Sequence, residues 1–141
     1  MIKNRPPSHK ASTVEAGLEP NNMDTNLHIN KDKFIKILKN FGLGEFTSVK
    51  KLKSGIVNPA FLLNEKYVLR LSDSEKLKDV PGYSTRFQRE AFLYRTLAQY
   101  GILVPECIGI DTSKEILTND YILITYIPGI NLEACFKTAN N

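Results

Sequence analysis

Three strand-like segments follow one another along the chain with connections too short for parallel pairing. Residues 46–52, 60–63 and 67–71 are rich in the residue types that fit a pleated sheet. A parallel return needs a crossover of about a dozen residues, whereas Asn64 and Glu65 suffice here as a short turn. The sequence therefore predicts three neighbouring antiparallel strands.

A helix is expected before these strands. Phe34, Ile37, Leu38 and Phe41 recur at helical spacing. Asn30 is suited to cap the amino terminus of this helix, and Gly42 stands where a left-handed residue would end it. The preceding residues, 1–29, contain three prolines and no apolar period. They are predicted to be a disordered tail, and residues 30–141 are predicted to form one domain.

The strongest helical pattern covers residues 85–100. Thr85 and Gln88 have the spacing of a capping box, and Gly101 follows the last turn. One face carries an apolar stripe made of Phe87, Ala91, Tyr94 and Ala98. The stripe indicates that this long helix packs against a sheet.

Two more strands complete the pattern, at residues 107–110 and 121–126. Residues 72–82 are interpreted as a charged, exposed loop, and residues 131–137 could form barely two helical turns. The order of elements is helix, three strands, helix, two strands. It predicts an α+β fold with a five-stranded antiparallel sheet packed by one long helix, preceded by a short helix and a disordered tail.

Composition excludes several classes of protein and site. The chain has 141 residues, a net charge of +4 and two cysteines, which rules out a disulfide scaffold. Both histidines, His9 and His28, lie in the predicted tail. The predicted domain can therefore hold neither a histidine-dependent triad nor a histidine-ligated zinc. No apolar run is long enough to span a bilayer, and no apolar run follows the basic start of the chain as a secretory signal requires. We expect a cytoplasmic protein without a membrane partner.

Arg70 is a cation on an otherwise apolar strand. Side chains alternate along a strand, so Arg70 shares a face with Val68. A buried cation needs a partner, and Glu90 on the long helix could provide one. Such a pair would leave guanidinium donors free for an anion such as phosphate. The alternative is an Arg on an edge strand that points to solvent, and the residues favour neither reading.

Two further segments could contact a ligand. Ser54, Gly55 and Asn58 lie between the first two strands, where backbone amides and side chains could approach a phosphate. An ordinary hairpin also needs one glycine, and that simpler explanation is favoured for the loop alone. After the last strand, Pro128 interrupts pairing and leaves main-chain groups near the strand end for a flat heterocycle or a simple turn.

Taken in order, these segments resemble the amino-terminal lobe of the protein-kinase-like fold as found in the aminoglycoside phosphotransferase family. The resemblance covers residues 45–133 and rests on the runs SGIVNPAFLL, YVLRL, FQREAFLYRTL, GILVPECIGID and YILITYIPGINL. It implies a lobe that binds ATP or GTP for transfer of the γ-phosphate to a hydroxyl of a small molecule.

The resemblance also assigns roles by position. Arg70 would contact the α- and β-phosphates, where the best-known members and the protein kinases carry lysine, and Glu90 would pair with it. Val68 would form the roof over the adenine. The phosphate-covering loop would contain Ser54, Gly55 and Asn58, and the hinge that meets the purine edge would be Thr125, Tyr126 and Ile127.

The resemblance leaves the catalytic parts of this fold without counterparts. The general base and the magnesium-binding Asp lie in the second lobe of such kinases. Residues 30–141 contain no histidine and no Asp-Phe-Gly run. We therefore expect no catalytic or metal-binding residue in this chain. The carboxy-terminal catalytic lobe is expected to be missing or supplied by a partner chain, with magnesium bound only in its presence.

Two alternatives remain open. The chain could be a non-catalytic, pseudokinase-like binding module, or a gene remnant, that engages a protein partner. Nucleic-acid binding would rest on Lys50, Lys51 and Lys53. Strand alternation divides that cluster between two faces, so this alternative is not favoured.

Overall fold

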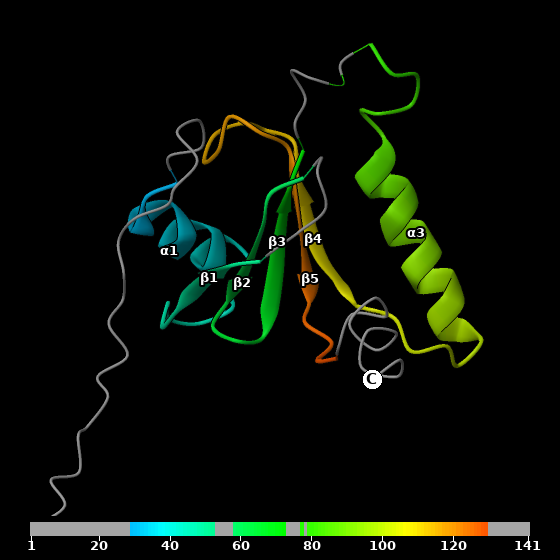
Figure 1. Ribbon diagram of the computed structural model, residues 1–141, viewed down its shortest axis with the longest axis horizontal. Coiled ribbons are helices and arrows are strands. Elements are labelled where there is room, and N and C mark those ends of the chain that lie inside the picture. The colour runs from blue at the N-terminus through cyan, green and yellow to red at the C-terminus, as the bar shows by residue number, and fades with distance from the viewer. Residues whose placement is uncertain (1–28, 53–57, 73–76, 78, 130–141) are drawn as a thin grey trace, which may run out of the picture.

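A computed structural model of the chain describes residues 29–52, 58–72, 77 and 79–129 (Figure 1). Most of the predicted tail, the loop residues Ser54 and Gly55, and the short helix expected at 131–137 lie outside the described residues. Ile29, which the sequence assigns to the tail, is buried in the core. The packed part of the chain therefore includes at least one residue more than expected.

The sheet has five strands, and every neighbouring pair is antiparallel. The spatial order is β1-β2-β3-β5-β4. The strands are β1 (Val49–Lys51), β2 (Ala60–Leu63), β3 (Tyr67–Leu71), β4 (Cys107–Asp111) and β5 (Tyr121–Thr125). The predicted α+β class and five-stranded antiparallel sheet are confirmed. The strand β3 lies in the middle of the sheet.

The first strand is shorter than predicted. The sequence predicts a strand over 46–52, but β1 contains only residues 49–51. The preceding backbone is bound by the side chain of Asn64 instead. Its Oδ1 accepts hydrogen bonds from the N–H groups of Thr47 at 2.8 Å and Ser48 at 3.3 Å, and its Nδ2 donates to the carbonyl of Glu45 at 2.8 Å. A side chain thus replaces the strand partner of this segment.

Replacing Asn64 with alanine should destabilise the fold by about 3 kcal/mol, because these three bonds are lost at roughly 1 kcal/mol each. Asn64 and Glu65 also have φ angles of +52° and +56°, which asparagine tolerates better than alanine. Glu65→Gly serves as the opposite control, because glycine removes the strain and should stabilise by about 0.5 kcal/mol. Urea denaturation followed by circular dichroism measures both. Equal stability of Asn64→Ala and the parent would show that these contacts are unimportant.

Helix α1 (Lys31–Asn40) covers one face of the sheet. The Oδ1 of Asn30 accepts a hydrogen bond from the N–H of Lys33 at 3.2 Å, and Gly42 has a φ of +67°, so both predicted ends are confirmed. The core on this side joins apolar residues of α1 to every second residue of the central strands: Phe34, Ile37, Leu38, Leu63, Leu69, Leu71, Tyr121 and Leu123.

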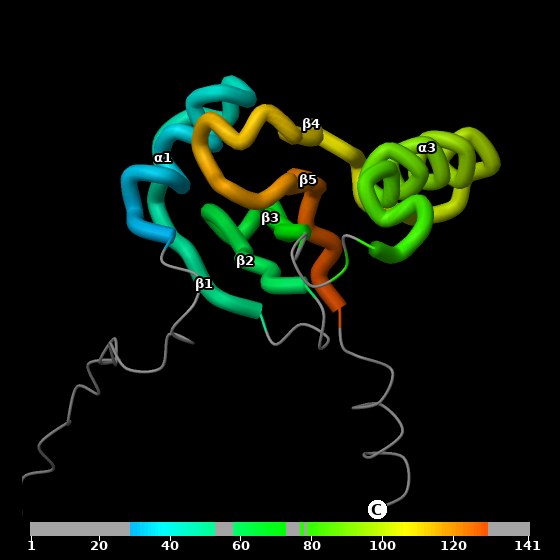
Figure 2. Tube along the Cα trace, turned by 90° about the horizontal axis from the view of Figure 1, so that it is seen from above, coloured from blue at the N-terminus to red at the C-terminus, as the bar shows by residue number. Residues whose placement is uncertain are grey.

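Helix α3 (Arg86–Gln99) lies on the other side of the curled sheet, as Figure 2 shows. Phe87 packs into a second buried cluster that also contains Ala60, Val68, Ile122 and Ile124. The predicted capping box is wrong, because the Thr85 side chain makes no cap hydrogen bond and its hydroxyl donates to the carbonyl of Gly82 at 3.3 Å. The last residue of the predicted stripe, Ala98, is exposed. The helix contacts the sheet mainly through its first half.

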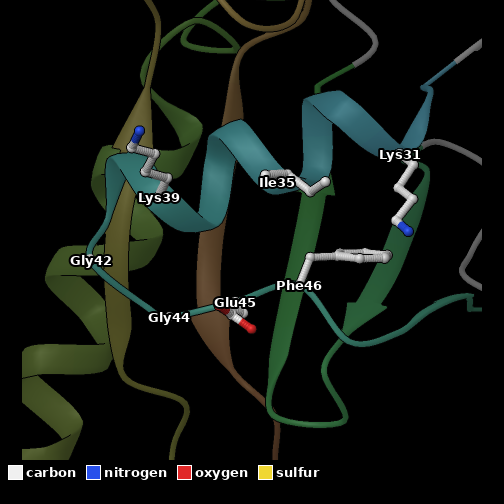
Figure 3. Close-up of a pocket in the computed structure, with 7 residues that line it drawn as sticks. All are labelled: Lys31, Ile35, Lys39, Gly42, Gly44, Glu45 and Phe46. Atoms are coloured by element: carbon white, nitrogen blue, oxygen red, sulfur yellow. The ribbon is translucent and has the colours of Figure 1, made fainter.

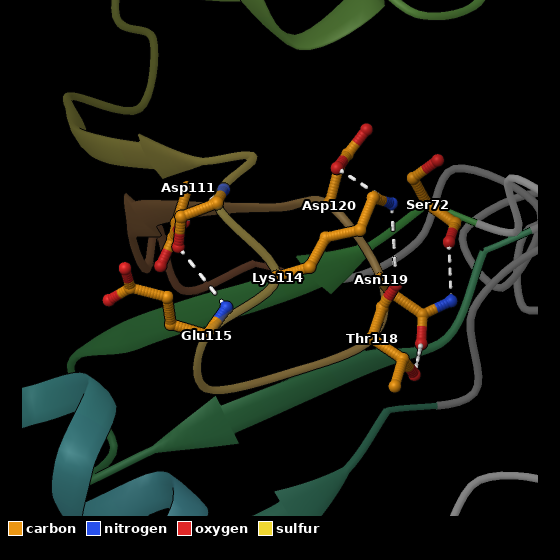
Figure 4. A network of polar contacts seen from close by, with 8 residues as sticks. Ser72, Asp111, Lys114, Glu115, Thr118, Asn119 and Asp120 are labelled. Carbon is orange, nitrogen blue, oxygen red and sulfur yellow. Dashed lines mark hydrogen bonds and ion pairs between the residues drawn. The ribbon is translucent and has the colours of Figure 1, made fainter.

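The connection between β4 and β5 closes the end of the sheet where β3 finishes (Figure 4). The amide of Asn119 donates to the carbonyl of Ser72 at 2.7 Å, and the N–H of Ser72 donates to the carbonyl of Asp120 at 2.8 Å. The ammonium of Lys114 lies 3.2 Å from the Asp120 carboxylate. Ser72 is consequently buried, whereas the sequence predicts it in an exposed loop.

None of the helices in the described ranges has the length and apolar character needed to cross a bilayer.

Candidate functional site

The guanidinium of Arg70 and the carboxylate of Glu90 meet between the sheet and α3. The Nη1 of Arg70 donates a hydrogen bond to Oε1 of Glu90, and the two side chains are 26% and 19% exposed. The alternative of a solvent-directed Arg on an edge strand is wrong, because β3 is the central strand. The pair joins the middle of the sheet to the long helix and remains partly open to solvent.

Tyr94 supports Glu90 from the same helix, one turn later. Its hydroxyl donates to Oε1 of Glu90 at 2.5 Å. Burial, with a further contribution from Glu90, raises the pKa of Tyr94 to about 12. The phenol therefore stays protonated at neutral pH and remains a hydrogen-bond donor. Together with Arg70 it holds one carboxylate oxygen in place, which fixes the position of the Glu90 side chain.

Raising the pH above 10 should weaken the fold through Tyr94. The phenol has a pKa of 10.0 when unperturbed and about 12 in the fold. Between these values the unfolded state binds fewer protons, so the free energy of unfolding falls as pH rises. Tyr94→Phe should make this fall shallower, as measured by urea denaturation at intervals from about pH 9 to pH 11. A slope identical to that of the parent would contradict the assignment.

The sheet face beside this pair is apolar. Val68 is 9% exposed and lies opposite Ile124 in the register of β3 and β5. Ala60 and Ile122 flank Arg70 in the same way on the two neighbouring strands. The structure thus places Val68 and Arg70 on one face, as strand alternation predicts, with the cation next to an apolar surface.

Asn58 lies just before β2 and contacts the start of the long helix. Its Oδ1 accepts hydrogen bonds from Nη1 of Arg86 at 3.1 Å and from the hydroxyl of Tyr83 at 3.4 Å. Sequence reasoning names Asn58 but misses Arg86. The available signal was the four-residue spacing between Arg86 and Glu90, which puts both on one face of α3.

The predicted hinge begins at Thr125, the last residue of β5, and continues through Tyr126 and Ile127. Two of the three N–H groups are already bonded. The N–H of Thr125 donates to the carbonyl of Glu106 at 2.9 Å, and the N–H of Tyr126 donates to the carbonyl of Lys66 at 2.7 Å. The Thr125 hydroxyl oxygen accepts from the N–H of Glu106 at 2.9 Å. A ligand at this edge would therefore find its backbone donor at Ile127 or beyond.

Two hollows occur in the described part of the chain. The larger, of about 550 Å³, lies between α1 and the segment after it (Figure 3). Its lining consists of Lys31, Ile35, Lys39, Gly42, Gly44, Glu45 and Phe46. The smaller, of about 390 Å³, lies between α3 and β4 and includes Cys107, where burial raises the pKa of the thiol. Neither hollow is lined by Arg70 or Glu90.

Comparisons with known proteins find similarity to phosphotransferases. The model of the phosphotransferase enzyme family matches residues 48–141. The streptomycin–ATP ternary complex of APH(2")-IIa has a similar structure, with a TM-score of 0.51, 19% sequence identity and coverage of 79% of this chain and 35% of that chain. The GDP complex of aminoglycoside 2'-phosphotransferase-IIIa gives a TM-score of 0.53 at 21% identity, covering 72% of this chain and 32% of that one.

A third similar structure is a putative aminoglycoside phosphotransferase from Ralstonia eutropha, with a TM-score of 0.53, 18% identity and coverage of 73% and 29% of the two chains. No curated protein sequence matches the chain. At these identities the likeness concerns the fold. The chain spans about a third of the length of the structures it resembles, and it corresponds to their amino-terminal part.

Proposed function

The chain belongs to the phosphotransferase enzyme family, and on that basis we propose that it forms the nucleotide-binding lobe of a small-molecule kinase of the aminoglycoside phosphotransferase type. The nucleotide would be ATP or GTP, and the phosphoryl acceptor a hydroxyl of a small molecule. A cytoplasmic location is part of this proposal. The lobe would comprise residues 30–141 together with Ile29, whose side chain is buried in the core.

The observation that carries the proposal is the pair of Arg70 and Glu90 beside apolar residues on one face of the sheet. A guanidinium has five N–H donors, and a carboxylate partner uses only some of them. The remaining donors suit phosphate oxygens, to which charge-assisted hydrogen bonds are short and strong. The apolar face next to the cation suits a purine ring.

Each predicted binding residue has a part in this proposal. Arg70 binds the α- and β-phosphates, and Glu90, held by Tyr94, orients the guanidinium. Val68 covers the adenine ring from the sheet. At the hinge, the backbone of Thr125, Tyr126 and Ile127 faces the purine edge, with Ile127 supplying the donor because the other two N–H groups are bonded. Asn58, together with Ser54 and Gly55, belongs to the loop that covers the phosphates.

Phosphoryl transfer would need more than this lobe. Positioning of the acceptor and neutralisation of charge by magnesium account for most of the catalysis in such reactions. Among the described residues, no three His, Cys, Asp or Glu side chains are grouped closely enough to hold a metal ion. We propose that magnesium, the catalytic base and the acceptor site belong to a second lobe or partner chain, and that this chain alone transfers no phosphate.

A second candidate is a non-catalytic module that engages a protein partner. Large apolar side chains on α3 and the connection after it favour this candidate. Five of them are at least half exposed: Phe92, Leu93, Tyr100, Ile102 and Leu103. Large exposed apolar patches mark interaction sites, so these side chains are candidates for a partner surface. A second lobe could cover the same residues, so nucleotide binding separates the two candidates.

Isothermal titration of the chain with ATP, GTP and adenosine, each with and without magnesium, tests the proposal. We expect saturable binding of at least one triphosphate, weaker binding of adenosine, and no phosphate transfer to kanamycin in a parallel assay. Absence of binding of every nucleotide, together with a stable complex with a second protein chain, would replace the proposal with the binding module.

A further inference from the structure

Arg86 is a second cation at the phosphate end of the proposed site. Its guanidinium carbon lies 5.1 Å from the centroid of the Tyr83 ring and 4.9 Å from that of the Phe87 ring. Its Nη1 donates to Oδ1 of Asn58 at 3.1 Å. Contacts with two rings and one amide oxygen restrain a side chain that is otherwise long and mobile.

The charge of Arg86 is not balanced by the described residues. No carboxylate among them forms an ion pair with it. The first turn of α3 contains no acidic residue but does contain Arg86 and Arg89. Positive side chains are unfavourable at the amino-terminal end of a helix, because the helix dipole is positive there. An arrangement that costs stability locally is expected where a ligand compensates for it.

The register of the sheet gives the order of the groups along the site. Thr125 lies opposite Tyr67, three residues or about 10 Å along β3 from Arg70. In the other direction, the N–H of Leu71 donates to the carbonyl of Pro59 at 3.0 Å. Asn58 is therefore level with the residue after Leu71, about 7 Å beyond Arg70.

The long helix gives the same order. It runs antiparallel to β3, with its first turn beside the end of that strand (Figure 1). Arg86 precedes Glu90 by one helical turn, which is about 6 Å along the axis. The hinge, the pair of Arg70 and Glu90, and finally Arg86 with Asn58 thus follow one another in a single direction. A nucleotide with its base at the hinge would extend its phosphates from Arg70 toward Arg86.

We propose that Arg86 binds the terminal phosphate of a nucleoside triphosphate, while Arg70 binds the phosphates nearer the ribose. This inference rests on the proposed nucleotide-binding function and makes Arg86 a determinant of triphosphate over diphosphate binding. Its guanidinium retains N–H donors beyond the one bonded to Asn58, and these donors are available to phosphate oxygens.

A purely structural role is the competing explanation. In this explanation, Arg86 connects the segment at Asn58 to α3 and does not contact a ligand. In that case its loss would weaken binding of every nucleotide alike, or would lower stability without any effect that depends on phosphate number. The two roles therefore differ in how the effect of a substitution varies across ATP, ADP, AMP and tripolyphosphate.

Titration of the 141-residue chain and its Arg86→Gln variant with these four ligands tests the inference. Loss of a charged hydrogen bond predicts about 10-fold weaker binding of ATP and of tripolyphosphate. ADP and AMP should change by less than about 2-fold, because their phosphates stay near Arg70. Arg86→Lys keeps the charge without the planar fork and should give an intermediate ATP affinity.

Arg89→Gln is the matched control, because it removes the same charge from the same helical turn. The Nη2 of Arg89 donates to the carbonyl of Gly82 at 2.7 Å, and the residue is exposed. It should leave the ratio of ATP to ADP affinity unchanged. Thermal unfolding of each variant by circular dichroism verifies that it is folded.

The outcomes separate the two proposals. Equal loss of ATP and ADP affinity in Arg86→Gln, or no loss of either, would overturn the role of Arg86 and leave the nucleotide-binding function standing. If the parent chain binds tripolyphosphate in an Arg86-dependent way but no nucleotide, Arg86 is a polyphosphate ligand and the nucleotide function is wrong. If the parent binds none of the four, both proposals are wrong.

Discussion

Replacing Arg70 with alanine should weaken binding of ATP or GTP by about 10- to 100-fold, because hydrogen bonds to charged groups contribute about 1.5–3 kcal/mol. Isothermal titration or equilibrium dialysis measures the change. The loss should appear for the diphosphate as well as the triphosphate, since Arg70 lies on the hinge side of Arg86 in the proposed site. Adenosine affinity should change little.

The Arg70 variant also affects stability, and its controls must separate the two effects. Alanine leaves the partly buried Glu90 carboxylate with Tyr94 as its hydrogen-bond donor, and an unpaired charge in such a place is costly. Arg70→Ala combined with Glu90→Gln removes the uncompensated charge and should recover stability but not affinity. Arg95→Ala, on an exposed position of the same helix, should change neither. Nucleotide affinity equal to that of the parent in a folded Arg70→Ala chain would exclude Arg70 from the site.

Replacing Gly109 with alanine should destabilise the fold by about 3 kcal/mol, at the upper end for overpacking of a core. A Cβ at this position would lie 2.1 Å from Cε1 and 2.8 Å from Cδ1 of the Phe41 ring. Phe41 packs against the core beneath α1 and makes an edge contact with Tyr121, with the ring centroids 6.4 Å apart. The ring or the strand must therefore move. Urea denaturation of the variant measures the cost.

Two further variants make the Gly109 prediction specific. Gly129→Ala introduces the same methyl group where nothing lies within 4 Å, and should change stability by less than about 0.5 kcal/mol. Phe41→Leu shortens the opposing side chain, so Gly109→Ala should cost less in that background, a coupling of about 1 kcal/mol or more. Additive effects of the two substitutions would show that they do not meet in the fold.

The sequence was informative about elements and less so about their ends. Strand alternation and short connections predict the antiparallel sheet, and apolar spacing predicts both helices. The predicted range of the first strand is too long. The Asn64 side chain, seventeen residues away from Thr47, takes the bonds that a strand partner would make. The Thr85 cap is mispredicted because residue spacing does not reveal whether a side chain turns toward its own helix or toward Gly82.

In the candidate site, too, the sequence suggests some contacts and does not reveal others. Pairing of Arg70 with Glu90 was one of two alternatives that the residues alone left open, because a cation on an apolar strand can either find a partner or point to solvent. The position of β3 in the middle of the sheet and the contact with Glu90 decide for the pair. The contact between Arg86 and Asn58 is not predictable, because it joins residues 28 positions apart across a loop. The occupied N–H groups of Thr125 and Tyr126 likewise depend on Glu106 and Lys66, whose proximity follows from the sheet order.

The central claim is that nucleotide binds on the sheet face between Arg70 and the hinge. Titration of the ¹⁵N-labelled chain with ATP, followed by amide chemical shifts, tests this claim directly and tolerates weak binding. We predict saturable shifts concentrated at Val68, Arg70, Glu90 and Ile127. Shifts confined to the hollow around Lys31, Lys39 and Phe46, on the opposite face, or no saturable shifts at all, would contradict it.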